Sequence, residues 1–205
     1  MIAVLDYGIG NLRSAEKALQ HVGADARLVA DPAEVERADA VVLPGVGAFG
    51  PCAEALRSSG LEEAARRAIA SGLPFFGICI GLQLLYEGSD EAPGVPGIGV
   101  MSGTVRALPP GVKCPQMQWN RLQREPGRPS AMLAGLEEAP WAYFVHSFAP
   151  DPSGEDADTV VATCDYGGAV VAAVERGPLW GAQFHPEKSG KVGLAMLANF
   201  VAATR

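Results

Sequence analysis

Short apolar runs alternate with helical segments along the first half of this chain, and this alternation constrains its fold more than any other feature. Four nearly continuous apolar runs are typical of buried strands: residues 1–5, 27–30, 40–43 and 73–76. Residues 12–22 carry apolar side chains at helical spacing before Gly23, Asp31-Pro32 is typical of a helix start, and residues 61–70 favour another helix. Strands separated by helices predict a parallel sheet covered on both faces.

The second half of the chain changes character. Between residues 93 and 115, glycines and prolines separate short strand-like pieces, which predicts antiparallel hairpins. Further strands are expected at residues 100–107, 141–148, 159–164, 169–175 and 179–184, exposed loops at 125–130 and 151–158, and a closing helix at 191–203. We therefore expect one α/β domain over residues 1–205, with a mostly parallel central sheet flanked by helices and additional antiparallel strands in the second half. A chain of this length, 48% apolar, can bury such a core.

Charge and cysteine usage exclude several classes of protein. The net charge of −7 without a basic block disfavours binding to nucleic acid or anionic membranes. No apolar run approaches membrane-spanning length, and Asp6 comes too early for a secretory leader, so we expect a cytoplasmic protein. The four cysteines form no Cys-x-x-Cys pair or metal-like spacing, so a zinc site is not expected. Nothing else in the sequence implies a metal or an organic cofactor. Cys52, Cys114 and Cys164 are interpreted as small buried hydrophobic residues or bystanders.

The remaining cysteine stands in an unusual position. In the stretch Gly77-Ile78-Cys79-Ile80-Gly81, it lies between an apolar strand and a helix expected to open at Leu82. Such a sharp turn holds its central residue in strained backbone geometry, and flanking glycines remove side chains that would clash. The positive end of the helix dipole would favour the thiolate, which is the nucleophilic form. Cys79 is therefore a candidate nucleophile, and the alternative is a buried structural thiol.

A base and a carboxylate occur far downstream, in His185-Pro186-Glu187. Residues two apart on an extended segment point to the same side, so Glu187 can reach one imidazole nitrogen while the other faces a thiol. An activated nucleophile requires this pairing of a base with a group that orients it. The spacing predicts a Cys79–His185–Glu187 triad, against the alternative of a partly buried histidine and a solvated glutamate.

A glycine-rich loop at residues 44–50, Pro-Gly-Val-Gly-Ala-Phe-Gly, follows the third predicted strand. Ligands of parallel sheets bind beyond the carboxyl ends of the strands, where this loop and the Cys79 turn both fall. Acyl transfer needs backbone N–H donors aimed at the developing oxyanion, worth on the order of 3 kcal/mol each. The loop lacks the Gly-Lys-Ser/Thr of a phosphate-binding loop, so an oxyanion loop is the functional interpretation and an ordinary glycine-rich connection is the alternative.

These segments together resemble the class I, or triad-type, glutamine amidotransferases. Residues 77–83 match that family's nucleophile turn, and residues 183–187 match its His/Glu motif. Other stretches look specifically like the glutaminase subunits of imidazole glycerol phosphate synthase, an enzyme of histidine biosynthesis: residues 6–12, 43–49, 119–120, 146–148 and 185–189.

The resemblance implies a reaction and a role for each matching residue. Cys79 would attack the side-chain amide of glutamine, His185 would pass the thiol proton to the departing ammonia, Glu187 would orient His185, and water would release glutamate. The resemblance also assigns an oxyanion hole and a substrate-binding set, which are the backbone N–H groups of Val46, Gly47 and Ile80 and the residues Gln83, Ser147 and Phe148. For Gln83 the alternative is a polar residue that caps the helix.

The resemblance also implies a partner, a separate (βα)₈-barrel cyclase with which the glutaminase forms a heterodimer. Ammonia would pass into the barrel and react there with a nucleotide, giving imidazole glycerol phosphate and an aminoimidazole carboxamide ribonucleotide. Asn11, Trp119 and Lys188 match positions expected at the partner face. Their alternative interpretations are a helix cap, a core aromatic and a surface lysine.

The chain departs from the family at one stretch, where Gln116 and Gln118 replace the usual histidine and glycine. Neither belongs to the triad, so the departure concerns local loop geometry and signalling to the partner. Three rival functions remain open: a glutaminase for another acceptor, such as that of pyridoxal phosphate synthesis, a non-catalytic docking module, and a cysteine peptidase. Residues 6–11 and 187–189 argue against the first, and the complete triad argues against the second.

Overall fold

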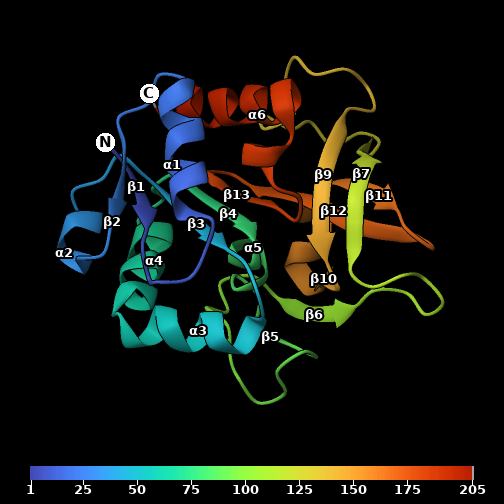
Figure 1. Cartoon of the computed structure of the whole chain (residues 1–205), viewed down its shortest axis with the longest axis horizontal. Coiled ribbons are helices and arrows are strands. Elements are labelled where there is room, and N and C mark those ends of the chain that lie inside the picture. The colour runs from blue at the N-terminus through green and yellow to red at the C-terminus, as the bar shows by residue number, and fades with distance from the viewer. Residues whose placement is uncertain (205) are drawn as a thin grey trace.

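A computed structural model describes residues 1–204. Its central sheet has eight strands in the order β2-β1-β3-β4-β13-β12-β11-β8 (Figure 1). Their bounds are β1 (Ile2–Leu5), β2 (Ala26–Val29), β3 (Ala40–Gly45), β4 (Phe75–Cys79), β8 (Gln123–Arg124), β11 (Val160–Asp165), β12 (Ala169–Arg176) and β13 (Leu179–Ala182). The strands from β2 to β13 in this order are parallel, and β12, β11 and β8 are antiparallel. The predicted fold class is therefore confirmed.

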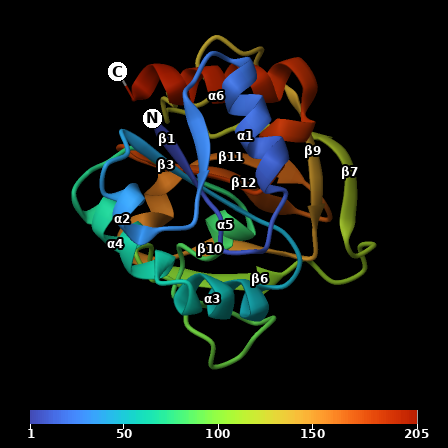
Figure 2. The same ribbon diagram turned by 60° about the vertical axis from the view of Figure 1, so that its left-hand side comes forward.

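Helices cover both faces of the sheet. The helical elements are α1 (Leu12–His21), α2 (Pro32–Val35), α3 (Phe49–Ser58), α4 (Leu61–Ala70), α5 (Ile80–Gln83), α6 (Gly190–Ala203) and the short 3₁₀ helices η1 (Gly154–Thr159) and η2 (Pro186–Lys188). Figures 1 and 2 show α1 beside α6 on one face and α3 beside α4 on the other. Phe200 of α6 packs on Phe76 and Trp180 of the sheet, with ring centroids 5.3 and 5.5 Å away. No helix within residues 1–204 is long and apolar enough to cross a membrane.

Local signals explain several element boundaries. The carboxylate of Asp31 accepts a hydrogen bond from the backbone N–H of Ala33 at 2.9 Å, and Pro32 occupies the first turn of α2, as the sequence predicts. The helix α4 matches the predicted range 61–70. The helix α3 was not predicted, because it begins at Phe49, within the stretch interpreted as a glycine-rich loop.

The second half differs from prediction in two respects. The strand β6 (Gly103–Ala107) forms no local hairpin, because it pairs with the distant β10 (Phe148–Pro152) and with β5 (Gly88–Ser89) in a three-stranded sheet. Residues 151–158 are mostly exposed, as predicted, but they are not a loop, since Asp151 and Pro152 belong to β10 and the following residues form η1, which buries Asp156.

The predicted single strand at residues 141–148 is two strands. β9 (Trp141–His146) pairs with β7 (Gln116–Arg121) in a separate antiparallel ribbon, and β10 begins at Phe148 in the three-stranded sheet. Ser147 lies at the corner where the chain passes from one sheet to the other. This corner brings Ser147 and Phe148 to the carboxyl ends of β3 and β4, where they face the same cavity as Cys79.

Candidate active site

Cys79 ends β4 at the sharp turn into α5. Its φ of 56° is positive, and it is the one non-glycine residue with positive φ within residues 1–204. A Cβ atom on Gly81 would lie 1.8 Å from the Leu43 carbonyl oxygen, and one on Gly77 would lie 2.7 Å from the Gly81 oxygen. The two glycines therefore permit a close approach that no other residue allows, and the turn stores strain at the thiol.

The helix after this turn differs from the prediction. It begins at Ile80, not at Leu82, and α5 lasts only a single turn, to Gln83. A one-turn helix aligns few peptide dipoles, so its positive end contributes less to a thiolate than a full helix would. Any stabilisation of a thiolate here therefore depends more on the groups that lie around the sulfur.

His185 and Glu187 form a buried pair. The Nδ1 atom of His185 lies 2.7 Å from Oε1 of Glu187, and their side chains are 1% and 2% exposed. The segment is not extended throughout as predicted, since His185 is extended but Glu187 lies in the tight turn η2. The turn still places both side chains on one side, and the hydrogen bond directs the Nδ1 proton to Glu187 and leaves Nε2 for other chemistry.

Two further residues hold this pair in place. Asn11 donates from Nδ2 to Oε1 of Glu187 at 3.3 Å. Asn11 occupies the N-cap position of α1, as the helix-cap interpretation expects, but its side chain makes no cap hydrogen bond and bonds Glu187 instead. Ser189 is buried, donates from Oγ to the His185 carbonyl at 2.7 Å and accepts from the Tyr143 backbone N–H at 3.0 Å. Ser189 thereby ties the His185 turn to β9.

The two imidazoles of this region have opposite electrostatic environments. Burial lowers the pKa of His185, but the Cys79 thiol and the Glu187 carboxylate outweigh burial and raise it to about 9. Its Nε2 atom is buried without a hydrogen-bond partner. Burial lowers the pKa of His146 to about 4, and the charge of His185 acts in the same direction, against a hydrogen bond from Nδ1 to the Phe148 carbonyl at 2.9 Å.

One cavity of about 540 Å³ joins most of the predicted site residues. A cavity of this size suits a small-molecule ligand. Of the residues named from the sequence, those lining it are Cys79 and His185, then Val46, Gly47 and Ile80, then Gln83, Ser147 and Phe148, and finally Asn11 and Lys188. Glu187 lies behind His185, and Trp119 does not line the cavity.

The Pro44–Gly47 loop is held from behind by two side chains. The Tyr7 hydroxyl donates to the Pro44 carbonyl at 2.8 Å, and the Cys52 thiol donates to the Val46 carbonyl at 3.2 Å. The Phe49 backbone N–H donates to Oε2 of Glu91 at 2.8 Å. Glu91 also lines the cavity, so it connects the loop to the site. Cys52 is thus buried with a defined partner, whereas Cys114 is exposed.

Gln83 uses its amide inside the protein. Its Nε2 donates to the Phe148 carbonyl at 2.9 Å and to Oε1 of Gln183 at 3.0 Å, while its own Oε1 is buried without a partner. Gln83 therefore does not cap α5. Gln183 in turn donates from Nε2 to the Cys79 sulfur at 3.7 Å.

The replaced residues 116 and 118 are accommodated differently. Gln116 is fully buried, and its amide contacts the Cys164 sulfur at 3.7 Å. Gln118 is exposed, so the larger side chain extends into solvent. Gln116 therefore packs under β7 with Cys164, and neither glutamine is hydrogen-bonded to Cys79, His185 or Glu187.

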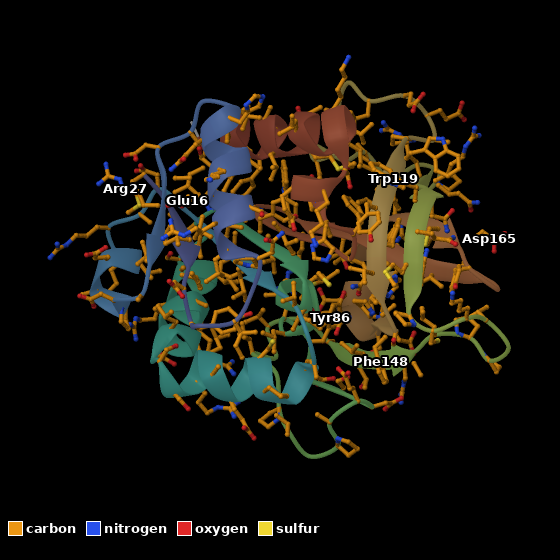
Figure 3. The ribbon with its side chains drawn as sticks, in the orientation of Figure 1. Glu16, Arg27, Tyr86, Trp119, Phe148 and Asp165 are labelled. Carbon is orange, nitrogen blue, oxygen red and sulfur yellow. The ribbon has the colours of Figure 1, made fainter. Side chains whose placement is uncertain are left out.

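Trp119 lies on the ribbon formed by β7 and β9 (Figure 3). It is 48% exposed, which contradicts the interpretation as a core aromatic, and its ring meets Tyr143 edge to face with centroids 5.9 Å apart. Met117 and Trp141 on the same ribbon are 63% and 45% exposed. Lys188 is an exposed residue at the rim of the cavity.

Sequence reasoning did not single out Gln183, Ser189, His146, Glu91 or Met117. The first three lie within the motif stretches at 146–148 and 183–189, so position in a motif was an available signal. Glu91 had none, because it reaches the cavity from a loop without a motif. No group of three or more metal-ligating side chains occurs within residues 1–204.

This arrangement agrees with comparisons to known proteins. A family model described as glutamine amidotransferase class-I matches residues 3–204. A crystal structure of a glutamine amidotransferase has a TM-score of 0.77 at 22% identity over 99% of this chain and 98% of the other. The structure of PurLQS from Thermotoga maritima has a TM-score of 0.79 at 21% identity over 100% and 98%. The chain belongs to the class I glutamine amidotransferases.

Closer relatives narrow the family. The imidazole glycerol phosphate synthase subunit HisH of Methanothermobacter thermautotrophicus is 48% identical over the whole of both chains. The HisH subunit of Symbiobacterium thermophilum is also 48% identical, over 97% of this chain and 92% of the relative. Within its class, the chain is a member of the HisH family of imidazole glycerol phosphate synthase subunits.

Proposed function

We propose that this chain hydrolyses glutamine to glutamate and ammonia with Cys79 as the nucleophile, and that it supplies the ammonia to a cyclase subunit that forms imidazole glycerol phosphate. The observation that carries the proposal is the convergence of three remote segments on one cavity. These segments are the strained Cys79 turn, the buried His185–Glu187 pair and the glycine-rich loop.

The protonation of His185 supports the first step. A pKa near 9 means that the imidazole carries a proton at neutral pH, with Nδ1–H donated to Glu187. A protonated imidazole beside Cys79 favours the thiolate. The thiolate attacks the side-chain carbonyl carbon of glutamine, and the carbonyl oxygen becomes an oxyanion that the backbone N–H groups of Val46, Gly47 and Ile80 stabilise.

The same imidazole then serves both halves of the reaction. His185 gives its Nε2 proton to the leaving nitrogen, so ammonia departs and a thioester remains on Cys79. Now neutral, His185 accepts a proton from water as that water attacks the thioester carbonyl. The second tetrahedral intermediate expels the thiolate and releases glutamate, which restores the starting pair.

The cavity walls support the binding of an α-amino acid. Gln83 presents a buried, unpartnered Oε1 that can accept a hydrogen bond, and the corner at Ser147 and Phe148 lies beside it. Glu91 adds a carboxylate to the same wall, suited to an ammonium group. These groups would hold the amino-acid end of glutamine and leave its amide at Cys79.

The exposed face of the β7–β9 ribbon supports a docking surface for the cyclase. Met117, Trp119 and Trp141 expose large apolar side chains there, and large exposed apolar groups on one face are typical of subunit interfaces. Asn11 and Lys188 at the cavity rim extend this surface to the active site. A (βα)₈-barrel cyclase seated here would receive ammonia before water protonates it.

Replacement of the nucleophile tests the proposal. Cys79→Ala should lower glutamine hydrolysis at least about a thousandfold while the circular dichroism spectrum stays unchanged. A glutamine-like electrophile such as 6-diazo-5-oxo-norleucine should label Cys79 in the unaltered chain. A variant that keeps its activity would contradict the assignment of the nucleophile.

The rivals give different outcomes in the same assays. A docking module would resist labelling, and a peptidase would cleave peptides and ignore glutamine. A glutaminase for another acceptor would be stimulated by a different barrel protein. We expect the isolated chain to be weakly active and the cyclase with its nucleotide to increase glutamine hydrolysis.

A further inference from the structure

Gln183 is the first residue after β13 and stands two positions before His185. Its side chain is fully buried, and its backbone N–H donates to the Ala172 carbonyl at 2.9 Å. A buried amide must satisfy its donors and its acceptor inside the protein. The side-chain Nε2 does so at the Cys79 sulfur, 3.7 Å away.

A single backbone carbonyl fixes the direction of this contact. The Phe148 oxygen can only accept, so the Gln83 amide must turn its Nε2 toward it, at 2.9 Å. The second hydrogen of that Nε2 points to Gln183 at 3.0 Å, which requires Oε1 of Gln183 there. If the Gln183 amide were rotated by half a turn, its Nε2 would face the Nε2 of Gln83, and two donors would be opposed. The Nε2 of Gln183 must therefore face the sulfur.

A donor at this position acts differently on each state of the sulfur. A thiolate accepts a hydrogen bond more strongly than a thiol does, because charge strengthens the bond. The sulfur of a thioester is a poor acceptor. The donor therefore favours the thiolate before attack and again when the thiolate leaves during hydrolysis of the thioester. The short helix α5 leaves this stabilisation to nearby side chains.

We propose that Gln183 is a further catalytic residue, whose amide N–H stabilises the Cys79 thiolate in an orientation set by Gln83. The inference rests on the proposed function for its place in the reaction. The contact itself does not depend on the substrate.

The test measures the reactivity of the sulfur in the full chain without glutamine. Iodoacetamide alkylation of Cys79 is followed as a function of pH by peptide mass spectrometry, which separates it from the exposed Cys114. Gln183→Met keeps the length of the side chain and removes the donor. The midpoint of alkylation should rise by about one pH unit, which makes alkylation roughly tenfold slower at a fixed pH below the midpoint.

The other titratable groups around the sulfur stay in place in this variant. They are His185, Glu187 and Lys188 after β13, His146 on β9, Tyr7 after β1, Cys52 on α3 and Glu91 in the loop after β5. Gln20→Met, which removes a surface amide bonded to the Ala26 carbonyl, is the matched control and should leave the midpoint unchanged.

Glutamine turnover supplies a second measurement. Gln183→Met should lower kcat roughly tenfold with little change in KM, because the amide contacts sulfur and not the amino-acid end of glutamine. A merely structural role would lower the melting temperature and leave the alkylation midpoint where it is. An unchanged midpoint in a folded Gln183→Met protein would overturn the inference.

Gln83→Met provides a second variant. Without the Gln83 donor, the Gln183 amide is free to turn, so the alkylation midpoint should rise in the same direction by a smaller amount. If Gln183→Met does not fold, the Gln83→Met variant tests the inference. An unchanged alkylation midpoint in this variant would then overturn the inference that a Gln183 amide oriented by Gln83 stabilises the thiolate. Failure of the proposed function would differ, since the unaltered chain would then not hydrolyse glutamine while the midpoint shift persisted.

Discussion

At the scale of single residues, two buried histidines make the stability of the protein depend on pH in the range between about 4 and 9. The pKa of His185 is raised to about 9, so its contribution is complete below the ordinary value of 6.5 and is lost as pH rises through 9. The pKa of His146 is lowered to about 4, so its contribution is complete above 6.5 and is lost as pH falls toward 4. The contributions of both histidines to the free energy of unfolding are therefore close to complete only near pH 6.5.

We expect the free energy of unfolding to be largest near pH 6.5 and to fall on each side by about 3 kcal/mol from these two groups. Urea unfolding at pH values from 4 to 9.5 measures this. His185→Gln should flatten the alkaline limb between about pH 6.5 and 8.5, and His146→Gln should flatten the acidic limb. Above that range the buried Cys52 and Cys164 thiols, whose pKa values burial raises to about 11, lower stability as well. Equal pH profiles for all three proteins would show that neither histidine controls stability.

At the scale of elements, the β4–α5 turn depends on close packing against β3. Gly81→Ala would place a methyl group 1.8 Å from the Leu43 carbonyl oxygen, so either the turn or β3 must move. We expect a loss of about 3 kcal/mol in unfolding free energy and a large loss of glutaminase activity.

Gly88→Ala is the control for this turn. Its methyl group would lie 3.6 Å from the Val95 carbonyl oxygen, in ordinary contact, and we expect a change below about 1 kcal/mol. Chemical denaturation of both variants provides the comparison. A Gly81→Ala protein as stable and active as Gly88→Ala would contradict the need for close packing here.

The β7–β9 ribbon is the element on which we propose that partner binding depends. The pairs Met117–Val145, Trp119–Tyr143 and Arg121–Trp141 stand opposite one another, and the Arg121 guanidinium lies 5.2 Å from the Trp141 ring centre. Such an apolar and cationic face suits the core of a subunit interface.

Trp119→Asp should therefore weaken binding to the cyclase at least about tenfold, since it puts a charge at the centre of this face. Isothermal titration calorimetry with the cyclase measures the Kd. Ala33→Asp adds the same charge on α2, at the opposite edge of the sheet in Figure 1, and should leave the Kd unchanged. Equal affinities for the two variants would place the partner elsewhere.

At the scale of the whole molecule, Asp156 joins the two larger sheets. Its buried carboxylate accepts from Arg176 of β12 at 2.8 Å and from the Ser102 backbone N–H, just before β6, at 2.7 Å. Asp156→Ala leaves the Ser102 N–H without an acceptor, whereas the partly exposed Arg176 keeps the Val100 carbonyl at 2.7 Å, so we expect a loss of about 2 kcal/mol in thermal or urea unfolding.

The pair of Arg128 with Asp158, 2.6 Å apart, is the comparison, because the Asp158 side chain is 90% exposed whereas that of Asp156 is 3% exposed. Asp158→Ala should cost less than about 1 kcal/mol, because water replaces an exposed partner. If the two aspartates had similar effects, Asp156 would not be a structural link between the sheets.

The sequence alone determined what depends on local spacing. The apolar runs and helical periodicity predict the parallel half of the sheet, because the burial pattern of each element can be recognised within a few consecutive residues. The glycines beside Cys79 and the two-residue spacing of His185 and Glu187 likewise express local geometry. Periodicity did not predict β7, because Met117 and Trp119 face outward and Gln116 faces inward, the reverse of an ordinary half-buried strand.

Only the tertiary structure decided which remote groups meet. Gln83 and Gln183 are a hundred positions apart, and Asn11 and Glu187 are 176 apart, so no pattern along the chain relates them. The corner at Ser147 forms because the segment 141–152 is divided between two sheets, with β9 in the ribbon and β10 in the three-stranded sheet. Hydrogen bonds between buried polar side chains are specific in space and carry no period in sequence, and for that reason the environment of the Cys79 sulfur emerges only when the sheet is assembled.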